Sequence, residues 1–134
     1  MADEQPSKQY SVFIVDDDQF LLNMYSVKFK SSGFEVKTAN SPRQALSELE
    51  NGLSADVLLF DIVMPGTDGL EMVAAIKKKG FLKNALFIAL TNQGQAVDVE
   101  RAKREGVNGY IVKASSIPSE VVAEVSRILK ENGK

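Results

Sequence analysis

Short apolar segments alternate along this chain with longer stretches whose apolar residues recur at helical spacing. The short segments are rich in β-branched and aromatic residues, which predicts strands. Two of them, 85–90 and, after its first residue, 56–60, are apolar throughout, as expected of central strands covered on both faces. Strands that alternate with helices lie parallel and are joined by crossover helices. The predicted strands are 10–15, 34–38, 56–60, 85–90 and 108–112.

Signals for the start of a helix fall between these strands. Ser41 followed three residues later by Gln44 has the spacing of a capping box and predicts a helix through about Glu50. Pro118 with Glu120 predicts the start of the last helix, which carries an apolar stripe. Right-handed strand-helix units form an open, doubly wound α/β sheet, so we expect one domain with a five-stranded parallel sheet and helices on both faces.

The polar residues that end the predicted strands all fall at one edge of such a sheet. Asp16, Asp17 and Asp18 follow the first strand, Asp61 follows the third, and Lys113 follows the fifth. The fourth strand ends in Thr-Asn, at 91 and 92. In open α/β sheets ligands bind outside the carboxyl ends of the strands, so this edge is the predicted functional site.

Composition narrows the classes of function. The 134 residues, 44% of them hydrophobic, suffice for one core, and 16 Lys and Arg stand against 18 Asp and Glu. This balance gives no global basic field that would attract nucleic acid or anionic lipid. The apolar runs are too short to span a bilayer, and the first residues contain no apolar core of a signal peptide. We therefore expect a cytoplasmic protein. The chain has no cysteine and no histidine, so any histidine chemistry must come from another protein.

Three or more carboxylates at one edge repel one another unless a cation compensates them. With oxygen ligands alone, Mg²⁺ is the favoured ion and Mn²⁺ the second candidate. The Lys113 ammonium can hold a phosphate oxygen and the Thr91 hydroxyl can donate to another. These groups suit phosphoryl transfer to a carboxylate, which predicts Asp61 as the acceptor of an aspartyl phosphate.

Four segments carry a resemblance to a known family: VDDD (15–18), LLFDIVMPGTDG (58–69), ALTN (89–92) and GYIVKA (109–114). The chain resembles the receiver domains of bacterial two-component response regulators, of the stand-alone single-domain type. The resemblance implies a flavodoxin-like fold with strand order 2-1-3-4-5, a receiver domain over 10–131 and a frayed segment over 1–9.

The resemblance also implies roles for particular residues. Asp61 would take a phosphoryl group from a phosphohistidine on a sensor histidine kinase or a histidine phosphotransfer protein. Asp17 would bind Mg²⁺ directly, Asp16 mainly through water, and the Val63 carbonyl would add a ligand. Lys113 would grip the phosphoryl group.

A second set of implied roles concerns switching and the lifetime of the phosphoryl group. Thr91 would move toward that group and Tyr110 would turn inward, reshaping the face made by helix four, strand five and helix five, which would bind an unidentified target protein. Val63 and Gln93 occupy the two positions that, in the family, tune the rate at which the aspartyl phosphate is hydrolysed. No output domain follows Leu129, so we expect the signal to leave through protein contact.

The sequence departs from the family pattern after the fifth strand. Most receivers have a proline after the lysine, joined by a cis peptide, whereas Ala114 follows Lys113 here. We expect Lys113 to reach the site nonetheless, because the strand fixes where its side chain starts. Asn92 stands where many relatives have a small residue, and it would hinder an inward Tyr110.

Two other functions fit parts of the pattern. The Asp16–Asp18 run after a strand mimics the nucleophile motif of haloacid-dehalogenase-type phosphatases, but that family needs an acidic motif after its lysine, and Asp61 precedes Lys113. A pseudo-receiver that is never phosphorylated and acts only as a docking module is the other alternative. Binding of Mg²⁺ and turnover of phosphate esters discriminate between the three.

Overall fold

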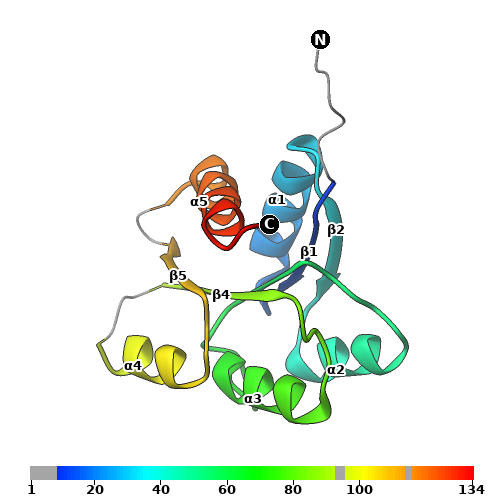
Figure 1. The fold of residues 1–134 in the computed structure, drawn as a ribbon, viewed down its shortest axis with the longest axis vertical. Coiled ribbons are helices and arrows are strands. Elements are labelled where there is room, and N and C mark those ends of the chain that lie inside the picture. Colours follow the sequence, from blue (N-terminus) through cyan, green and yellow to red (C-terminus); the bar gives the residue numbers. More distant parts are fainter. Residues whose placement is uncertain (1–8, 93–95, 114–115) are drawn as a thin grey trace.

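The computed structural model describes residues 9–92, 96–113 and 116–134, apart from the side chains of 96 and 97. Its five strands form one parallel sheet in the order β2-β1-β3-β4-β5. Helices α1 and α5 cover one face, and α2, α3 and α4 cover the other (Figure 1). This arrangement confirms the predicted doubly wound fold and its strand order. No helix in these ranges is long and apolar enough to cross a membrane.

Each strand begins one residue later than the sequence predicted. The elements are β1 (Ser11–Val15), α1 (Gln19–Ser31), β2 (Glu35–Ala39), α2 (Pro42–Glu50), β3 (Val57–Phe60), α3 (Gly69–Lys79), β4 (Leu86–Thr91), α4 (Ala96–Arg104), β5 (Gly109–Val112) and α5 (Pro118–Glu131). The predicted segment 1–9 lies, except for its last residue, outside the described ranges.

The core lies on both sides of the three central strands. Along β1, Val12 and Ile14 pack under α1 and α5, whereas Phe13 and Val15 face the other helices. Strands β3 and β4 are buried along their whole length. Burial on both faces explains why these segments read as continuous apolar runs rather than alternating ones.

Side chains cap the helices much as predicted. The Ser41 hydroxyl accepts a hydrogen bond from the N–H of Gln44 at 3.1 Å, but Gln44 reaches back to the N–H of Asn40, one residue before the cap. At α5 the Glu120 carboxylate accepts from the N–H of Ile117 at 2.9 Å, while Ile117 itself has no side-chain acceptor. The first box is therefore shifted by one residue, and the second has only its glutamate half.

The turn between β3 and α3 fixes the carboxyl end of the central strand. The Asp68 carboxylate accepts from the N–H of Glu71 at 2.8 Å, a capping box that starts α3. The Gly69 N–H donates to the Ile62 carbonyl at 2.8 Å, and a Cβ on Gly69 would lie 2.1 Å from the Asp61 carbonyl oxygen. Only glycine fits so close an approach, so this turn holds Asp61 against the start of the helix.

Candidate functional site

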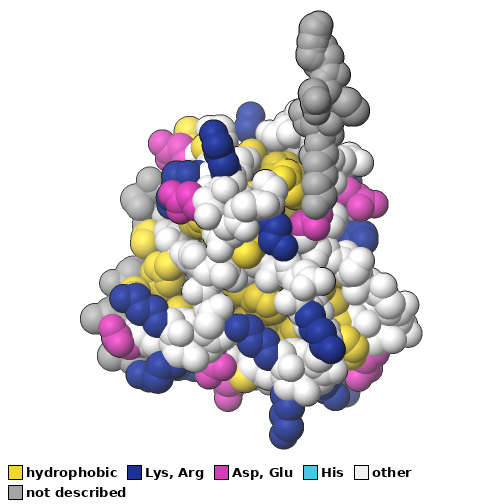
Figure 2. Space-filling model, viewed as in Figure 1, with side chains coloured by type: hydrophobic (Ala, Val, Ile, Leu, Met, Phe, Trp, Pro, Cys, Tyr) yellow, Lys and Arg dark blue, Asp and Glu magenta, His cyan; other side chains and the backbone are white. Residues whose placement is uncertain are grey.

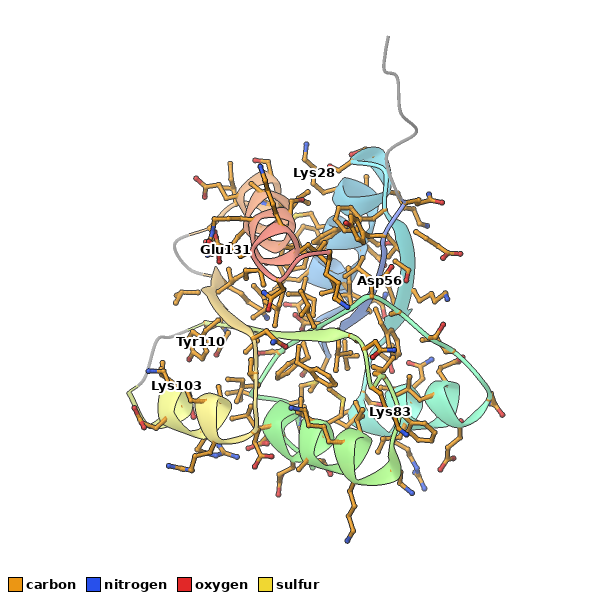
Figure 3. All side chains as sticks on the ribbon, in the orientation of Figure 1. Lys28, Asp56, Lys83, Lys103, Tyr110 and Glu131 are labelled. Atoms are coloured by element: carbon orange, nitrogen blue, oxygen red, sulfur yellow. The ribbon has the colours of Figure 1, made fainter. Side chains whose placement is uncertain are left out.

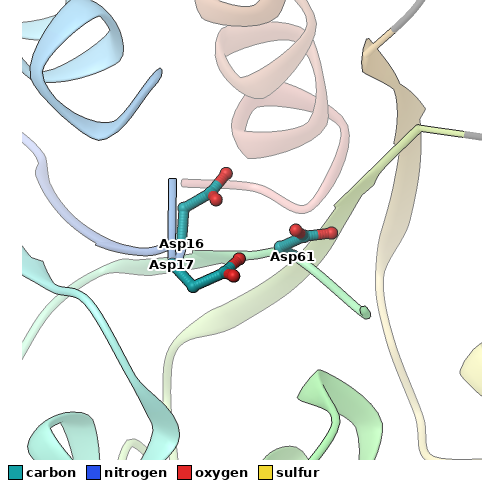
Figure 4. A group of neighbouring side chains, drawn as sticks. All are labelled: Asp16, Asp17 and Asp61. Atoms are coloured by element: carbon teal, nitrogen blue, oxygen red, sulfur yellow. The ribbon is translucent and has the colours of Figure 1, made fainter. Parts of the chain in front are cut away.

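Three aspartates meet at the carboxyl edge of the sheet. Asp16 and Asp17 follow β1, and Asp61 follows the neighbouring strand β3, so the register of the sheet brings them together. Each offers an oxygen atom within 4.8 Å of the others (Figure 4). Asp16 and Asp61 are only 1% and 5% exposed, whereas Asp17 is exposed. Such a set of oxygens fits a hard divalent cation that keeps part of its water, as Mg²⁺ and Mn²⁺ do.

Lys113 comes from the end of β5 and lies across the site. Its ammonium donates to Asp16 Oδ2 at 2.8 Å and to Asp61 Oδ2 at 3.3 Å, and its side chain is 6% exposed. The expectation that Lys113 reaches the site without a following proline is therefore met. The peptide between Lys113 and Ala114 lies outside the described residues, as does Gln93.

One ammonium does not compensate this site fully. Burial raises the pKa of Asp61 and the charge of Asp16 adds to the rise, while Lys113 and the N–H of Val63 oppose it. Burial lowers the pKa of Lys113, but its hydrogen bond to Asp16 and the charges of both aspartates outweigh burial and raise it. The raised pKa of Lys113 keeps its ammonium charged at neutral pH, and a metal ion beside the three aspartates would favour the ionised form of Asp61 further.

Backbone groups orient the carboxylates further. Asp16 accepts from the N–H of Asp18 at 2.9 Å, and the Asp18 carboxylate in turn caps α1 by accepting from the N–H of Leu21 at 3.1 Å. Asp61 accepts from the N–H of Val63 at 3.4 Å, a long hydrogen bond. Val63 itself is 69% exposed.

Thr91 and Tyr110 lie on neighbouring strands beside the acidic cluster. Thr91 ends β4 and is 2% exposed. Tyr110 on β5 lies on the side of the sheet that α4 covers, where it lines a small cavity with Val99 and Ala102 (Figure 3). Burial and Asp98 raise the pKa of Tyr110, and a side-chain hydrogen bond with Thr91 opposes the rise. The two predicted switch residues are therefore in contact.

Sequence reasoning missed Tyr25. It lies on the inward face of α1, is 2% exposed, and lines a cavity together with Lys113. Its only sequence signal was a tyrosine among the apolar residues of the helix, which is equally typical of a core residue.

Comparison with known proteins identifies the class to which this fold and site belong. Residues 12–125 match the response regulator receiver domain family, and the chain belongs to that family. The response regulator SaeR of Staphylococcus aureus (strain USA300) is 31% identical over 118 residues, which are 88% of this chain and 50% of SaeR. This chain therefore spans about half the length of that relative.

Solved structures agree with the family. The chemotaxis response regulator CheY4 of Vibrio cholerae has 28% sequence identity and a TM-score of 0.82, covering 91% of this chain and 100% of that one. A DNA-binding response regulator of the LuxR family from Staphylococcus aureus has 28% identity and a TM-score of 0.77, covering 89% and 98%. The chain therefore contains a response regulator receiver domain with the receiver fold.

Proposed function

We propose that this protein accepts a phosphoryl group on Asp61 from a phosphohistidine of a partner protein, in a reaction that depends on Mg²⁺. The proposal rests on the buried carboxylate of Asp61, which is grouped with two further aspartates and a lysine. Burial raises the pKa of this carboxylate. A charge buried at such a cost to stability indicates a functional group rather than a structural one. The receiver family supports the same reaction.

In the proposed transfer an oxygen of Asp61 attacks phosphorus. The bond between phosphorus and the donor imidazole breaks, and the imidazole nitrogen keeps the electron pair. Asp16, Asp17, Asp61 and the Val63 carbonyl would hold Mg²⁺, or Mn²⁺ in its place, and the ion would neutralise the phosphoryl oxygens. Lys113 needs only to exchange its longer contact, that with Asp61 at 3.3 Å, for one of those oxygens.

Thr91 and Tyr110 are the proposed switch. Because a side-chain hydrogen bond joins them, a Thr91 hydroxyl that turns toward the phosphoryl group must release Tyr110. The face of α4, β5 and α5 would then change shape for a target protein. Phosphorylation shifts this equilibrium only as far as its new contacts favour one of the two states.

We further propose that residues 10–131 form the receiver unit and that it acts in the cytoplasm with protein partners, a kinase or phosphotransfer protein and a target. Positive and negative side chains are interspersed on the face drawn in Figure 2, which supports protein partners over nucleic acid or a membrane surface.

Intact-mass measurement after incubation with Mg²⁺ and acetyl phosphate tests the proposal. The wild type should gain one phosphoryl group, and Asp61→Asn should gain none. Asp56→Asn is the matched control, because Asp56 lies at the opposite edge of the sheet, where its carboxylate accepts from the N–H of Ser11 at 2.9 Å; it should behave as the wild type. A folded, Mg²⁺-binding wild type that gains no mass even from a phosphorylated histidine protein would overturn phosphorylation in favour of a docking module.

The exposed Val63 side chain predicts a long-lived phosphoryl group, because valine cannot orient an attacking water molecule. Val63→Asn should hasten loss of the phosphoryl group severalfold in a time course of intact mass. Val27→Asn is the control, since Val27 is exposed to a similar degree, 68% against 69%, but lies on α1. Equal loss rates in the wild type and Val63→Asn would count against this role.

A further inference from the structure

A cavity of about 580 Å³ opens beside Lys113 at the carboxyl edge of the sheet. Residues of α1 and of the start of α5 form its apolar rim. Its polar lining consists of Tyr25, Asn92, Lys113 and Ser116. The space is many times the volume of a water molecule, and four polar side chains are enough to hold one in place.

Tyr25 is the most deeply buried of these polar groups. Its ring packs in the core with Leu22, Phe29 and Val125, and the residue is 2% exposed. Among the residues that the structure describes, its hydroxyl makes no hydrogen bond. A buried hydroxyl without a partner destabilises the folded protein, so native structures almost always supply one, from the protein or from an ordered water.

The Lys113 ammonium likewise has one N–H donor without an acceptor among the described residues. An ammonium group has three N–H donors, and two of these are taken by Asp16 and Asp61. In the described part of the chain nothing accepts the third. The charges of the site also act on the phenol. The pKa of Tyr25 is raised, chiefly by burial; Lys113 lowers it, and the charges of Asp16, Asp61 and Asp18 raise it.

We propose that Tyr25 is a positioning residue for Lys113. A water molecule in the cavity accepts the third N–H of the ammonium and also the O–H of Tyr25. This satisfies both groups and keeps the ammonium turned toward Asp61. The inference deepens the proposed function, on which it rests, and adds a group that never touches the phosphoryl oxygens itself.

The role follows from what Lys113 must do during transfer. When the phosphoryl group arrives, the ammonium exchanges a carboxylate contact for a phosphoryl oxygen. The link to Tyr25 need not change, because it lies on the cavity side of the ammonium. Tyr25 therefore gives Lys113 one contact common to the resting and the phosphorylated states, and such pre-organisation favours transfer.

Tyr25→Phe tests this role, because it removes the hydroxyl and keeps the ring. Solvent exchange of the Lys113 ammonium protons, followed by ¹⁵N NMR at Nζ, should quicken by about tenfold, the effect expected from losing one hydrogen bond to a charged group. Phosphorylation by acetyl phosphate should slow by about tenfold as well, with unchanged Mg²⁺ affinity. The melting temperature should fall. Tyr10→Phe is the matched control, because Tyr10 precedes β1 at the amino end of the sheet. It should leave ammonium exchange, the phosphorylation rate and Mg²⁺ affinity as in the wild type.

Two outcomes separate this inference from the function on which it rests. Unchanged ammonium exchange together with an equal or higher melting temperature would overturn the role of Tyr25, because removing an unpartnered buried hydroxyl stabilises a protein. A wild type that takes up no phosphoryl group would overturn the proposed function instead, and the exchange and melting measurements would still decide whether Tyr25 holds Lys113.

Discussion

Two clusters in this protein have the same make-up, one cation between two carboxylates. In the site, Lys113 lies between Asp16 and Asp61. On α5, Arg127 pairs with both Glu124 and Glu131. The side chains of the first cluster are 6%, 1% and 7% exposed, and those of the second are 51%, 38% and 59% exposed.

The two clusters also differ in how the chain brings them together. Arg127 is three and four residues from its partners, so one helical turn places them side by side. Lys113 is 97 and 52 residues from its partners, and only the folded sheet unites them. The Arg127 pairing is nearly automatic, whereas the Lys113 pairing depends on the whole fold.

This difference teaches which charges report on function. An exposed cluster keeps its water and loses little by ionising, so it says little about what the protein does. A buried cluster is desolvated, and its attraction seldom repays that cost. Burial does raise the pKa of Asp61 despite Lys113. The fold keeps a destabilising group here, and the phosphoryl chemistry proposed for it supplies the reason.

The largest predicted effect comes from removing the buried cation. Lys113→Met should slow phosphorylation by about 100-fold or more, because a group that stabilises the transferring oxygens is lost. Without metal it should also lower the free energy of unfolding by about 2–3 kcal/mol, since two buried carboxylates lose their partner. Mg²⁺ should restore part of that stability. Acetyl phosphate labelling and urea denaturation, with EDTA or with Mg²⁺, measure both effects.

Lys79→Met is the control for this prediction. Lys79 is an exposed lysine 3.8 Å from Glu50, with half of its side chain in solvent. Its replacement should change neither labelling nor stability beyond about 0.5 kcal/mol. If Lys113→Met were as neutral as this control, the site would not depend on its ammonium and the contrast between buried and exposed clusters would fail.

A smaller effect of opposite sign is expected at the acceptor. A carboxylate whose pKa is raised in the folded state adds stability at low pH and loses that contribution as the pH rises through the folded value. Asp61→Asn should therefore be more stable than the wild type in EDTA at neutral pH, by about 1 kcal/mol. The gain should shrink as the pH falls toward the ordinary aspartate value.

Urea denaturation of both proteins across that pH range, without metal, checks the sign. Asp56→Asn again serves as the control and should show no such pH-dependent gain. Asp61→Asn that is less stable than the wild type at neutral pH would mean that Lys113 more than compensates the charge of Asp61.

Most of the site could be predicted from the sequence, because its geometry follows from topology. The carboxyl ends of parallel strands meet at one edge, so Asp16, Asp61 and Lys113 had to lie near one another once the strands were recognised. The central strands were recognisable because their apolar runs are short and rich in β-branched and aromatic residues. Their starts were predicted one residue early, which is within the one or two residues by which element boundaries commonly differ.

The contacts that could not be predicted are those made by packing rather than by pattern. The charges around Arg101 are typical of a solvated helix face, yet Arg101 donates to Asp68 at 2.8 Å and so ties α4 to the cap of α3. Tyr25 likewise meets the cavity of Lys113 only because α1 packs beside α5. No spacing in the sequence encodes either contact.

The smallest predicted effect belongs to the exposed cluster. Its hydrogen bonds lower the pKa of Glu124 and raise that of Arg127, but both groups keep contact with solvent. Arg127→Met should leave phosphorylation unchanged and the melting temperature within about 1 °C of the wild type, in low salt as in high salt. Thermal unfolding at the two salt concentrations decides this. A loss of stability approaching that of Lys113→Met would mean that burial does not separate the two clusters, and the inference from a buried charge to a functional site would lose its basis.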